Sequence, residues 1–279
     1  MATLVCFHAH PDDEAIATGG SMARASDEGH RVVLVVATDG IHGERPDDLA
    51  PDESLVDRRK AETMASAAAL GIHRVEFLDY HDSGMTGWDA NGHDHAFANA
   101  DLDEAATRLA DIVRDERADV LTIYDWHGGY GHPDHIRVHE VGCRAEEMVR
   151  DDLPDLRVVE STMNRDEMRR GLDAARADGV DFGPDEFDPD GPMDDGNPMG
   201  TPEAEITLAV DVSAWAERKR RSIAAHRSQV TDSSFFLQMP MDAFTGAFGT
   251  EWYIEHDRDA RSGPRRGWLF DEVGSAHPA

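Results

Sequence analysis

The sequence predicts an α/β fold in which helices cover both faces of a mostly parallel β-sheet. Short apolar runs typical of buried strands alternate with longer stretches typical of helices. Two clusters of polar residues directly follow two of the apolar runs. Because alternating strands and helices form βαβ units, the strands are expected to run parallel. In sheets of this kind, ligands bind at the carboxyl ends of the strands.

The individual elements are predicted from hydrophobic periodicity. Strands are predicted at residues 3–7, 32–37, 74–80, 119–124, 156–161 and 205–212. Helices are predicted at residues 14–28, 54–70, 101–116, 134–150 and 211–229. In the helix at 101–116, Leu102, Ala106, Leu109 and Val113 form an apolar stripe at helical spacing, which indicates a face packed on the sheet.

The C-terminal half contains one long stretch without apolar periodicity. Residues 181–202 are rich in Gly, Pro and Asp, which predicts a long acidic loop. The loop is interpreted either as a solvated connection or as a flap beside a substrate cleft. Residues 205–279 are expected to form a C-terminal cap region on the same domain. With 279 residues and a sizeable core, we expect residues 1–279 to form a single domain.

Composition and charge argue against several classes of protein. The net charge of -30 argues against nucleic acid or anionic membrane as a partner. No apolar stretch approaches the roughly 20 residues of a membrane helix, and no export signal precedes the first strand. Cys6 and Cys143 are the only cysteines, so a reduced, cytoplasmic setting is expected. The sequence is also compatible with a homo-oligomer.

The acidic surface has two interpretations. Asp and Glu number 57, whereas Lys60 and Lys219 are the only lysines among 27 basic residues. A salt-adapted (halophilic) surface explains this composition, because high ionic strength screens repulsion between carboxylates. A GC-rich genome, which favours Arg and Asp, is the alternative. The first interpretation predicts a melting temperature that rises with salt concentration, and the second predicts no such rise.

The two polar clusters are the candidate site. The segment HPDDE, residues 10–14, follows the strand at 3–7, and GGYGHPDH, residues 128–135, follows the strand at 119–124. Ionisable groups crowded at a buried strand end are costly unless a metal, a substrate or solvent satisfies them. Pro133 suits the first position of a helix, which would place His132 and His135 in its opening turn.

These residue types are typical of a catalytic metal site. A catalytic zinc has three protein ligands and one position open for water, and His10, Asp13 and His135 would form such a set. Asp12 is then free to act as a general base. By position alone, His132 and His135 are both candidate ligands. The alternative is that each histidine is a satisfied polar residue at a helix start, in a protein that is not an enzyme.

Two other enzyme classes lack their motifs in this sequence. A dinucleotide-binding domain needs GxGxxG after the first strand, but HPDDE occupies that place. A serine hydrolase of the α/β class needs GxSxG at a strand–helix turn, and the sequence contains none.

The pair of motifs resembles the PIG-L/LmbE-like N-acetylglucosaminyl deacetylase superfamily, which has a Rossmann-like fold. The likeness extends to DRRKAETMASAAALGI, YHDSGM, KRRSIAAHRSQ and AFGTEWYI, so it covers most of the chain. The resemblance implies a metal-dependent enzyme, usually with zinc and in some cases another divalent ion such as Fe2+. The reaction it implies is removal of an acetyl group from an N-acetylated amino sugar.

The resemblance also implies a role for each matching residue. The metal ligands match His10, Asp13 and His135, and the base matches Asp12. His132 matches the histidine that stabilises the oxyanion or protonates the leaving group, with Asp134 as its partner. Tyr130 matches a tyrosine near the tetrahedral intermediate. Arg59 and Asp82 match substrate-binding positions through looser patterns.

We therefore expect a zinc-dependent deacetylase whose partner is a small amino-sugar molecule. The alternatives are an amidase that cleaves a larger thiol conjugate with the same machinery, and a non-catalytic metal-binding protein. Trp126-His127 stands where many relatives carry small polar or acidic residues, which bears on the identity of the sugar more than on the chemistry.

Overall fold

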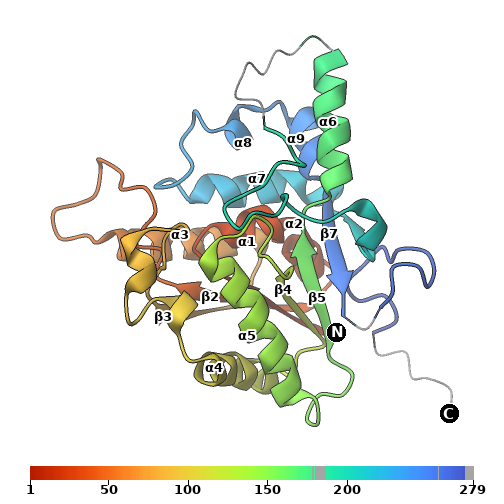
Figure 1. The fold of residues 1–279 in the computed structure, drawn as a ribbon, viewed down its shortest axis with the longest axis horizontal. Coiled ribbons are helices and arrows are strands. Elements are labelled where there is room, and N and C mark those ends of the chain that lie inside the picture. Colours follow the sequence, from red (N-terminus) through yellow and green to blue (C-terminus); the bar gives the residue numbers. More distant parts are fainter. Residues whose placement is uncertain (178, 180–186, 257, 274–279) are drawn as a thin grey trace.

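The computed structural model describes residues 1–177, 179, 187–256 and 258–273. A seven-stranded sheet crosses the middle of the molecule, with helices on both sides (Figure 1). Its strands are β1 (Thr3–His8), β2 (Arg31–Thr38), β3 (Arg74–Tyr80), β4 (Val120–Tyr124), β5 (Arg157–Thr162), β6 (Leu208–Asp211) and β7 (Thr250–Glu255). The predicted mostly parallel sheet with helices on both faces is confirmed.

The order of the strands determines where the two polar motifs meet. The order in the sheet is β3-β2-β1-β4-β5-β7-β6, and the first five strands are parallel. After β1 the chain builds the sheet outward through β2 and β3, and it then returns to place β4 on the other side of β1. Ligand sites in open α/β sheets lie at such a switch point. HPDDE follows β1 and GGYGHPDH follows β4, so both motifs lie there.

The helices form two layers. They are α1 (Asp13–Ala17), α2 (Gly19–Asp27), α3 (Leu55–Leu70), α4 (Leu102–Asp115), α5 (Pro133–Val149), α6 (Arg165–Ala177), α7 (Ala216–Ala225), α8 (Phe235–Gln238) and α9 (Met241–Phe248). Helices α4 and α5 pack on the sheet face that carries Val5 and Phe7. Helix α2 packs on the opposite face, against Leu4 and Cys6, and α7 lies over α1, α2 and α3.

Helix starts agree closely with the capping residues in the sequence. Ser54 caps α3 by accepting the N–H of Asp57, and Asp101 caps α4 by accepting the N–H of Glu104. The N-cap of α5 is His132, directly before Pro133. In each case the cap satisfies an N–H that has no partner inside the helix.

The helix predicted at 14–28 is in fact two helices, α1 and α2, separated at Thr18. The side chain of Thr18 is buried and lies 2.8 Å from Nε2 of His8 on β1. At the start of α2, a Cβ on Gly20 would lie 2.4 Å from Cγ2 of Val212. Glycine is therefore needed for the close approach of α2 to the end of β6.

The C-terminal part contributes to the sheet itself. The strand predicted at 205–212 is the shorter β6, and β7 was not predicted from hydrophobic pattern. Both strands are antiparallel to their neighbours and extend the sheet beyond β5. The helix predicted at 211–229 is the shorter α7, preceded by a 3-10 turn at Ser213–Trp215. Helix α6 was also not predicted, and none of its side chains is fully buried.

Part of the predicted acidic loop lies outside the described residues, namely 181–186. Residues 187–202 contain no helix or extended strand and pack against the turn that follows β4. The N–H of Gly200 donates to the carbonyl of Gly129 at 2.7 Å, and a carboxylate oxygen of Asp195 lies 3.3 Å from Nδ1 of His127. The end of this loop therefore lies beside the second polar motif.

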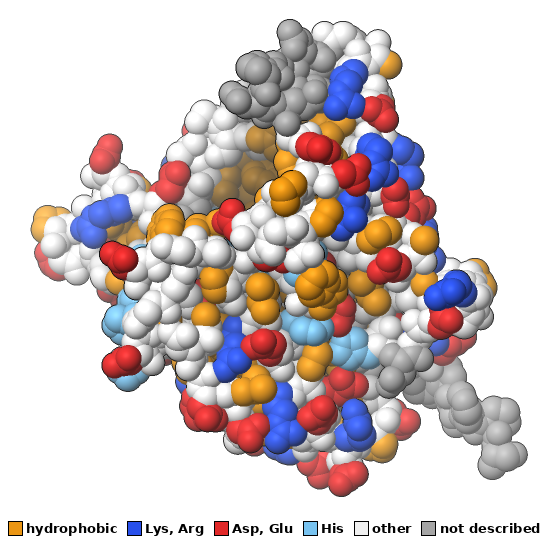
Figure 2. Space-filling model, in the orientation of Figure 1, with side chains coloured by type: hydrophobic (Ala, Val, Ile, Leu, Met, Phe, Trp, Pro, Cys, Tyr) orange, Lys and Arg blue, Asp and Glu red, His pale blue; other side chains and the backbone are white. Residues whose placement is uncertain are grey.

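Charged side chains are distributed over the surface. Figure 2 shows Asp and Glu side chains across the visible face, interspersed with Lys and Arg. Among the described residues, no helix combines the length and apolar character needed to cross a membrane.

A buried ion pair joins the C-terminal strands to the first layer of helices. The carboxylate of Glu251 on β7 accepts the N–H groups of Gly20 and Ser21 at the start of α2, both at 2.8 Å. The ammonium of Lys219 on α7 donates to the same carboxylate at 2.7 Å, and both side chains are 2% exposed. The charge of Glu251 is thus balanced by a lysine and by a helix N-terminus.

We predict that Lys219→Met lowers the free energy of unfolding by about 3–5 kcal/mol, because it leaves the buried Glu251 carboxylate without its cation. The matched control is Lys60→Met, the other lysine, which pairs with Asp79 at the surface. That change should cost about 0–1 kcal/mol. Urea unfolding of both variants measures the difference. Similar losses in the two variants would contradict a structural role for the buried pair.

Candidate active site

The structure brings the two motifs together at the carboxyl ends of β1 and β4. Three electron-pair donors face one another there: Nδ1 of His10, a carboxylate oxygen of Asp13 and Nε2 of His135. Nδ1 of His10 lies 3.3 Å from the Asp13 oxygen and 3.3 Å from Nε2 of His135. The distance from Nε2 of His135 to the Asp13 oxygen is 3.4 Å.

These distances fit a divalent metal ion. A tetrahedral zinc with bonds of about 2.0–2.1 Å to nitrogen and oxygen has ligand–ligand distances of about 3.3–3.4 Å. The triangle of donor atoms has edges of that size, and two imidazoles and a carboxylate are ligand types that zinc prefers. His10, Asp13 and His135 are therefore able to hold such an ion without rearrangement.

The outer nitrogens of both histidines have acceptors of their own. Nε2 of His10 lies 3.1 Å from a carboxylate oxygen of Asp134, and Nδ1 of His135 lies 3.2 Å from the carbonyl of Gly128. Neither acceptor carries a proton to give, so each imidazole donates outward and presents its lone pair to the triangle. Metal-ligating histidines are usually oriented in this way. Gly128 has φ +65°, and a Cβ there would lie 2.3 Å from Cβ of His135.

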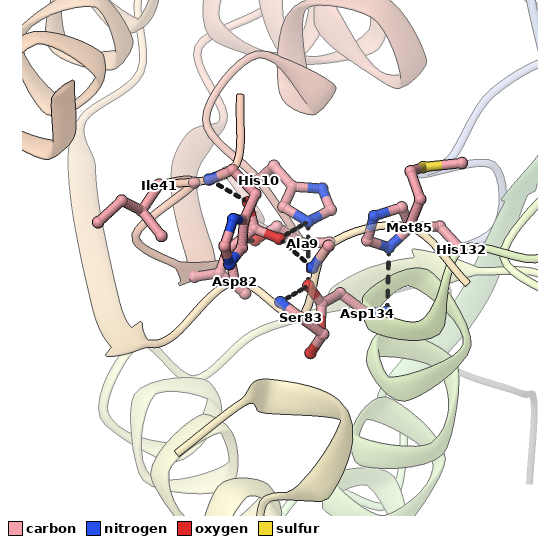
Figure 3. Close-up of polar contacts among 12 residues, drawn as sticks. Ala9, His10, Ile41, Asp82, Ser83, Met85, His132 and Asp134 are labelled. Carbon is pink, nitrogen blue, oxygen red and sulfur yellow. Dashed lines mark hydrogen bonds and ion pairs between the residues drawn. The ribbon is translucent and has the colours of Figure 1, made fainter. Parts of the chain in front are cut away.

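Buried carboxylates surround His10. The side chains of His10, Asp82, Ser83 and Asp134 point toward one another, with His132 and Met85 beside them (Figure 3). Burial alone would lower the pKa of His10, but its contacts with Asp13, Asp134 and Asp82 hold that pKa well above its usual value. The carboxylates of this cluster therefore strongly stabilise a positive charge placed among them.

Asp12 is held in a strained backbone conformation next to the triangle. Its φ is 110°, a region that residues with a side chain rarely adopt and that is often found at functional sites. The buried carboxylate of Glu14 accepts the N–H of Asp12 at 2.9 Å, and Arg59 donates to the Asp12 carboxylate at 3.1 Å. Burial raises the pKa of Asp12 to about 6, and Arg59 opposes part of this rise. A carboxylate of this kind suits general-base chemistry.

The structure places Arg59 and Asp82 as supports of the site. Arg59 is 3% exposed, and its guanidinium donates to the carbonyls of Pro11 and Gly40 as well as to Asp12. Asp82 is also buried and accepts N–H groups of His42 and Gly84. The substrate contacts expected for these two residues stay predictions, whereas their present contacts fix the loops around the triangle.

The carboxylate of Asp134 has partners other than the side chain of His132, so their predicted pairing stays a prediction. The carboxylate of Asp134 accepts from Ser83 and from His10, and it is the backbone N–H of Asp134 that bonds to His132. This N–H donates to Nδ1 of His132 at 3.1 Å, so Nδ1 carries no proton. Burial and the neighbouring His10 and His135 lower the pKa of His132 to about 3. With Nδ1 as an acceptor, His132 is a neutral imidazole with its proton on Nε2.

Tyr130 also lies at the triangle. Its hydroxyl is 3.4 Å from Nε2 of His135, and burial together with the negative charge of Asp13 raises its pKa above the ordinary value. The hydroxyl is thus a protonated donor beside the metal ligands. All the site residues expected from the two motifs lie within this one region.

Three residues of the site were not assigned from the sequence. His8 joins the hydroxyls of Tyr124 and Thr18, each at 2.8 Å, and burial lowers its pKa to about 4. Glu14 accepts from Ser66 and lies 2.7 Å from Nε2 of His226. Glu14 and His226 had a sequence signal, because they lie in HPDDE and in KRRSIAAHRSQ. In the sequence, these residues cannot be distinguished from other polar residues, because their contacts form only in the folded chain.

The sequence matches a known family and known relatives. Residues 5–146 match the family described as PIG-L: GlcNAc-PI de-N-acetylase. A protein of Acidothermus cellulolyticus named 1D-myo-inositol 2-acetamido-2-deoxy-alpha-D-glucopyranoside deacetylase is 41% identical over 265 residues, which cover 91% of this chain and 88% of the relative. A protein of the same name from Thermobifida fusca is 36% identical, with 94% and 95% of the two chains covered.

Solved structures share the fold. The N,N'-diacetylchitobiose deacetylase from Pyrococcus horikoshii superimposes with a TM-score of 0.58 and 22% identity, over 91% of this chain and 83% of that one. At this identity the likeness shows the fold alone, which is the fold predicted from the sequence.

Fold, site and relatives together define a metal-dependent hydrolase that acts on an amide bond. The chain belongs to the PIG-L family of de-N-acetylases. The expected deacetylase activity on N-acetylated amino sugars is thereby confirmed, and cleavage of a larger thiol conjugate is not favoured.

The geometry predicts different roles for two histidines in the first turn of α5. His135→Ala should empty the metal site, because it removes one corner of the triangle. His132→Ala should keep the metal and lose about 10²–10³-fold in turnover, because it removes a donor to the developing charge. Elemental analysis and turnover of both variants are the measurements. A metal-free His132→Ala protein, or one with full turnover, would show that the roles are assigned wrongly.

Proposed function

We propose that the protein removes the acetyl group from an N-acetylglucosamine linked to inositol, using one zinc ion at its active site. The observation that carries the proposal is the triangle of His10, Asp13 and His135, with edges of 3.3–3.4 Å, next to a carboxylate outside it, Asp12. The substrate follows from the relatives, which are named for the deacetylation of 1D-myo-inositol 2-acetamido-2-deoxy-alpha-D-glucopyranoside. Fe2+ is the alternative ion.

A divalent ion bound at the triangle supplies Lewis-acid chemistry, which activates water and polarises the acetyl carbonyl. The protein supplies the proton transfers. Asp12, oriented by Glu14 and Arg59, takes a proton from the attacking water. The water oxygen bonds to the acetyl carbon, and the bond from that carbon to the sugar nitrogen then breaks. The protonated Asp12 returns the proton to the leaving nitrogen, so acetate and a free amine are formed.

Two donors stabilise the negative charge that develops on the acetyl oxygen. The Nε2–H of His132 is one, because Nδ1 of the same ring is occupied by the N–H of Asp134. The hydroxyl of Tyr130 is the other, from its position beside His135. Donors that are fixed before the reaction lower the barrier without reorganisation of the site.

The substrate side of the site is bordered by two segments. Trp126, 58% exposed, precedes the GGYG turn, and Asp195 contacts His127 and lies against Gly131. We propose that these segments contact the group attached to the amino sugar. We also propose a reducing, cytoplasmic setting, since Cys6 and Cys143 are free thiols.

Acetate release from 1D-myo-inositol 2-acetamido-2-deoxy-α-D-glucopyranoside by the zinc-loaded protein tests the proposal. We expect turnover of this compound, and Asp12→Asn should bind zinc normally but lose about 10²–10⁴-fold in turnover. The paired control is Asp13→Asn, which should lose both the active-site zinc and turnover.

Two results would contradict the proposal. No acetate release from the inositol-linked sugar, with release from other N-acetylated sugars, would refute the substrate. An Asp12→Asn protein within a few-fold of wild type would refute the role of Asp12 and leave the substrate assignment intact.

A further inference from the structure

A second cluster of metal-ligating side chains lies outside the active site, between α5 and the strands β5 and β7. It consists of His139, Cys143 and Glu146 on α5, Glu160 on β5, and His256 just after β7. We call it the Cys143 cluster. His139 and Cys143 are four residues apart and so lie on one face of α5. Along the helix, Cys143 is about 12 Å from His135.

The cluster presents three ligand types within reach of one another. One ligand atom each from His139, Cys143 and Glu160 lie within 4.8 Å of one another. The sulfur of Cys143 lies 3.6 Å from Nε2 of His139. In a tetrahedral zinc site with bonds of about 2.3 Å to sulfur and 2.0–2.1 Å to nitrogen, a sulfur–nitrogen edge is about 3.5–3.6 Å. The Cys143–His139 pair already has this spacing.

The surroundings orient these groups as they do in known metal sites. Nδ1 of His139 lies 3.1 Å from the carbonyl of Tyr124 and 3.4 Å from a carboxylate oxygen of Glu160, and Nε2 of the same ring faces the sulfur of Cys143. His256 lies between two carboxylates, 2.9 Å from Glu146 and 2.8 Å from Glu160. It fixes the position of Glu160 beside Cys143.

The imidazoles of His139 and His256 border the thiol of Cys143. A metal ion binds such a thiol as the thiolate, and the proton is released. Cys6, in contrast, is fully buried in β1, and burial raises its pKa to about 12.

Solvent reaches the cluster. Cys143 is partly exposed and, with His139, lines an open surface cavity of 390 Å³. Histidine side chains are visible at the surface over β5 and beside α5 (Figure 2). Two arginines on the cavity wall are paired with glutamates on the same helix, Arg137 with Glu140 and Arg144 with Glu147, so they leave no net positive charge to repel a cation.

We propose that His139, Cys143 and Glu160 form a second site for a thiophilic divalent transition-metal ion such as zinc. Thiolate and imidazole ligands select zinc and related ions over Mg2+ and Ca2+, which prefer sites made of oxygen alone. A metal there joins β5 to α5, the helix that carries His135 at its start. The site needs neither the active-site ion nor its substrate.

Cobalt tests this proposal, because a cobalt–thiolate bond gives a charge-transfer band in the near ultraviolet. Metal-free protein is titrated with Co2+, and the band is expected in wild type, in His135→Ala and in the control Cys6→Ser, but not in Cys143→Ser. Zinc should also suppress the reaction of the Cys143 thiol with a thiol reagent in wild type, while Mg2+ at higher concentration should not.

Zinc content then separates the two sites. Cys143→Ser should bind one zinc ion fewer per chain than wild type, and His135→Ala should also bind one fewer. The proposal is overturned if wild type gives no thiolate band, or if Cys143→Ser binds as much zinc as wild type. If His135→Ala instead retains all its zinc while Cys143→Ser loses one ion, the active-site assignment fails and the second site stands.

Discussion

Positive charge placed among buried carboxylates is the constraint on which the active site depends. Asp13, Asp82 and Asp134 all approach His10, and an isolated buried carboxylate is strongly unfavourable. In the structure, the raised pKa of His10 favours its positively charged form, which neutralises part of the negative charge of the carboxylates. A divalent ion at the triangle would supply more positive charge at the same place. Nδ1 of His10 and Nε2 of His135 already face the triangle. The positive charge of such an ion would neutralise the carboxylates and would also promote amide hydrolysis.

Other buried charged side chains hold the loops that carry the site. Glu14 holds the strained Asp12 from one side and is itself paired with His226. Arg59 holds Asp12 from the other side. Farther away, Glu251 and Lys219 tie β7 and α7 to the start of α2, the helix after α1. Arg59 and His226, from segments outside the two polar motifs, therefore help to fix Asp12, Arg59 directly and His226 through Glu14.

The sequence predicted the parts of this structure that depend on local pattern. The five parallel strands, the capped helices α3, α4 and α5, and the meeting of the two motifs follow from periodicity and from the topology of parallel sheets. Helix α6, which has no fully buried side chain, was missed, and β7 was missed because its pairing depends on strands distant in sequence. For the same reason, the partner of Asp134 could not be read from its neighbour His132: Ser83 and His10 reach it only in the folded chain.

A crystal structure of the zinc-loaded protein, with the ion located by its anomalous scattering, tests the central claim most directly. We expect zinc within about 2.0–2.2 Å of Nδ1 of His10, a carboxylate oxygen of Asp13 and Nε2 of His135, with Asp12 and His132 unbound. His10 also belongs to two other groups of potential ligands, one with His132 and His135 and one with Asp82, His132 and Asp134. An ion bound to His132 in either group would contradict the assignment of ligands and the role of His132 together.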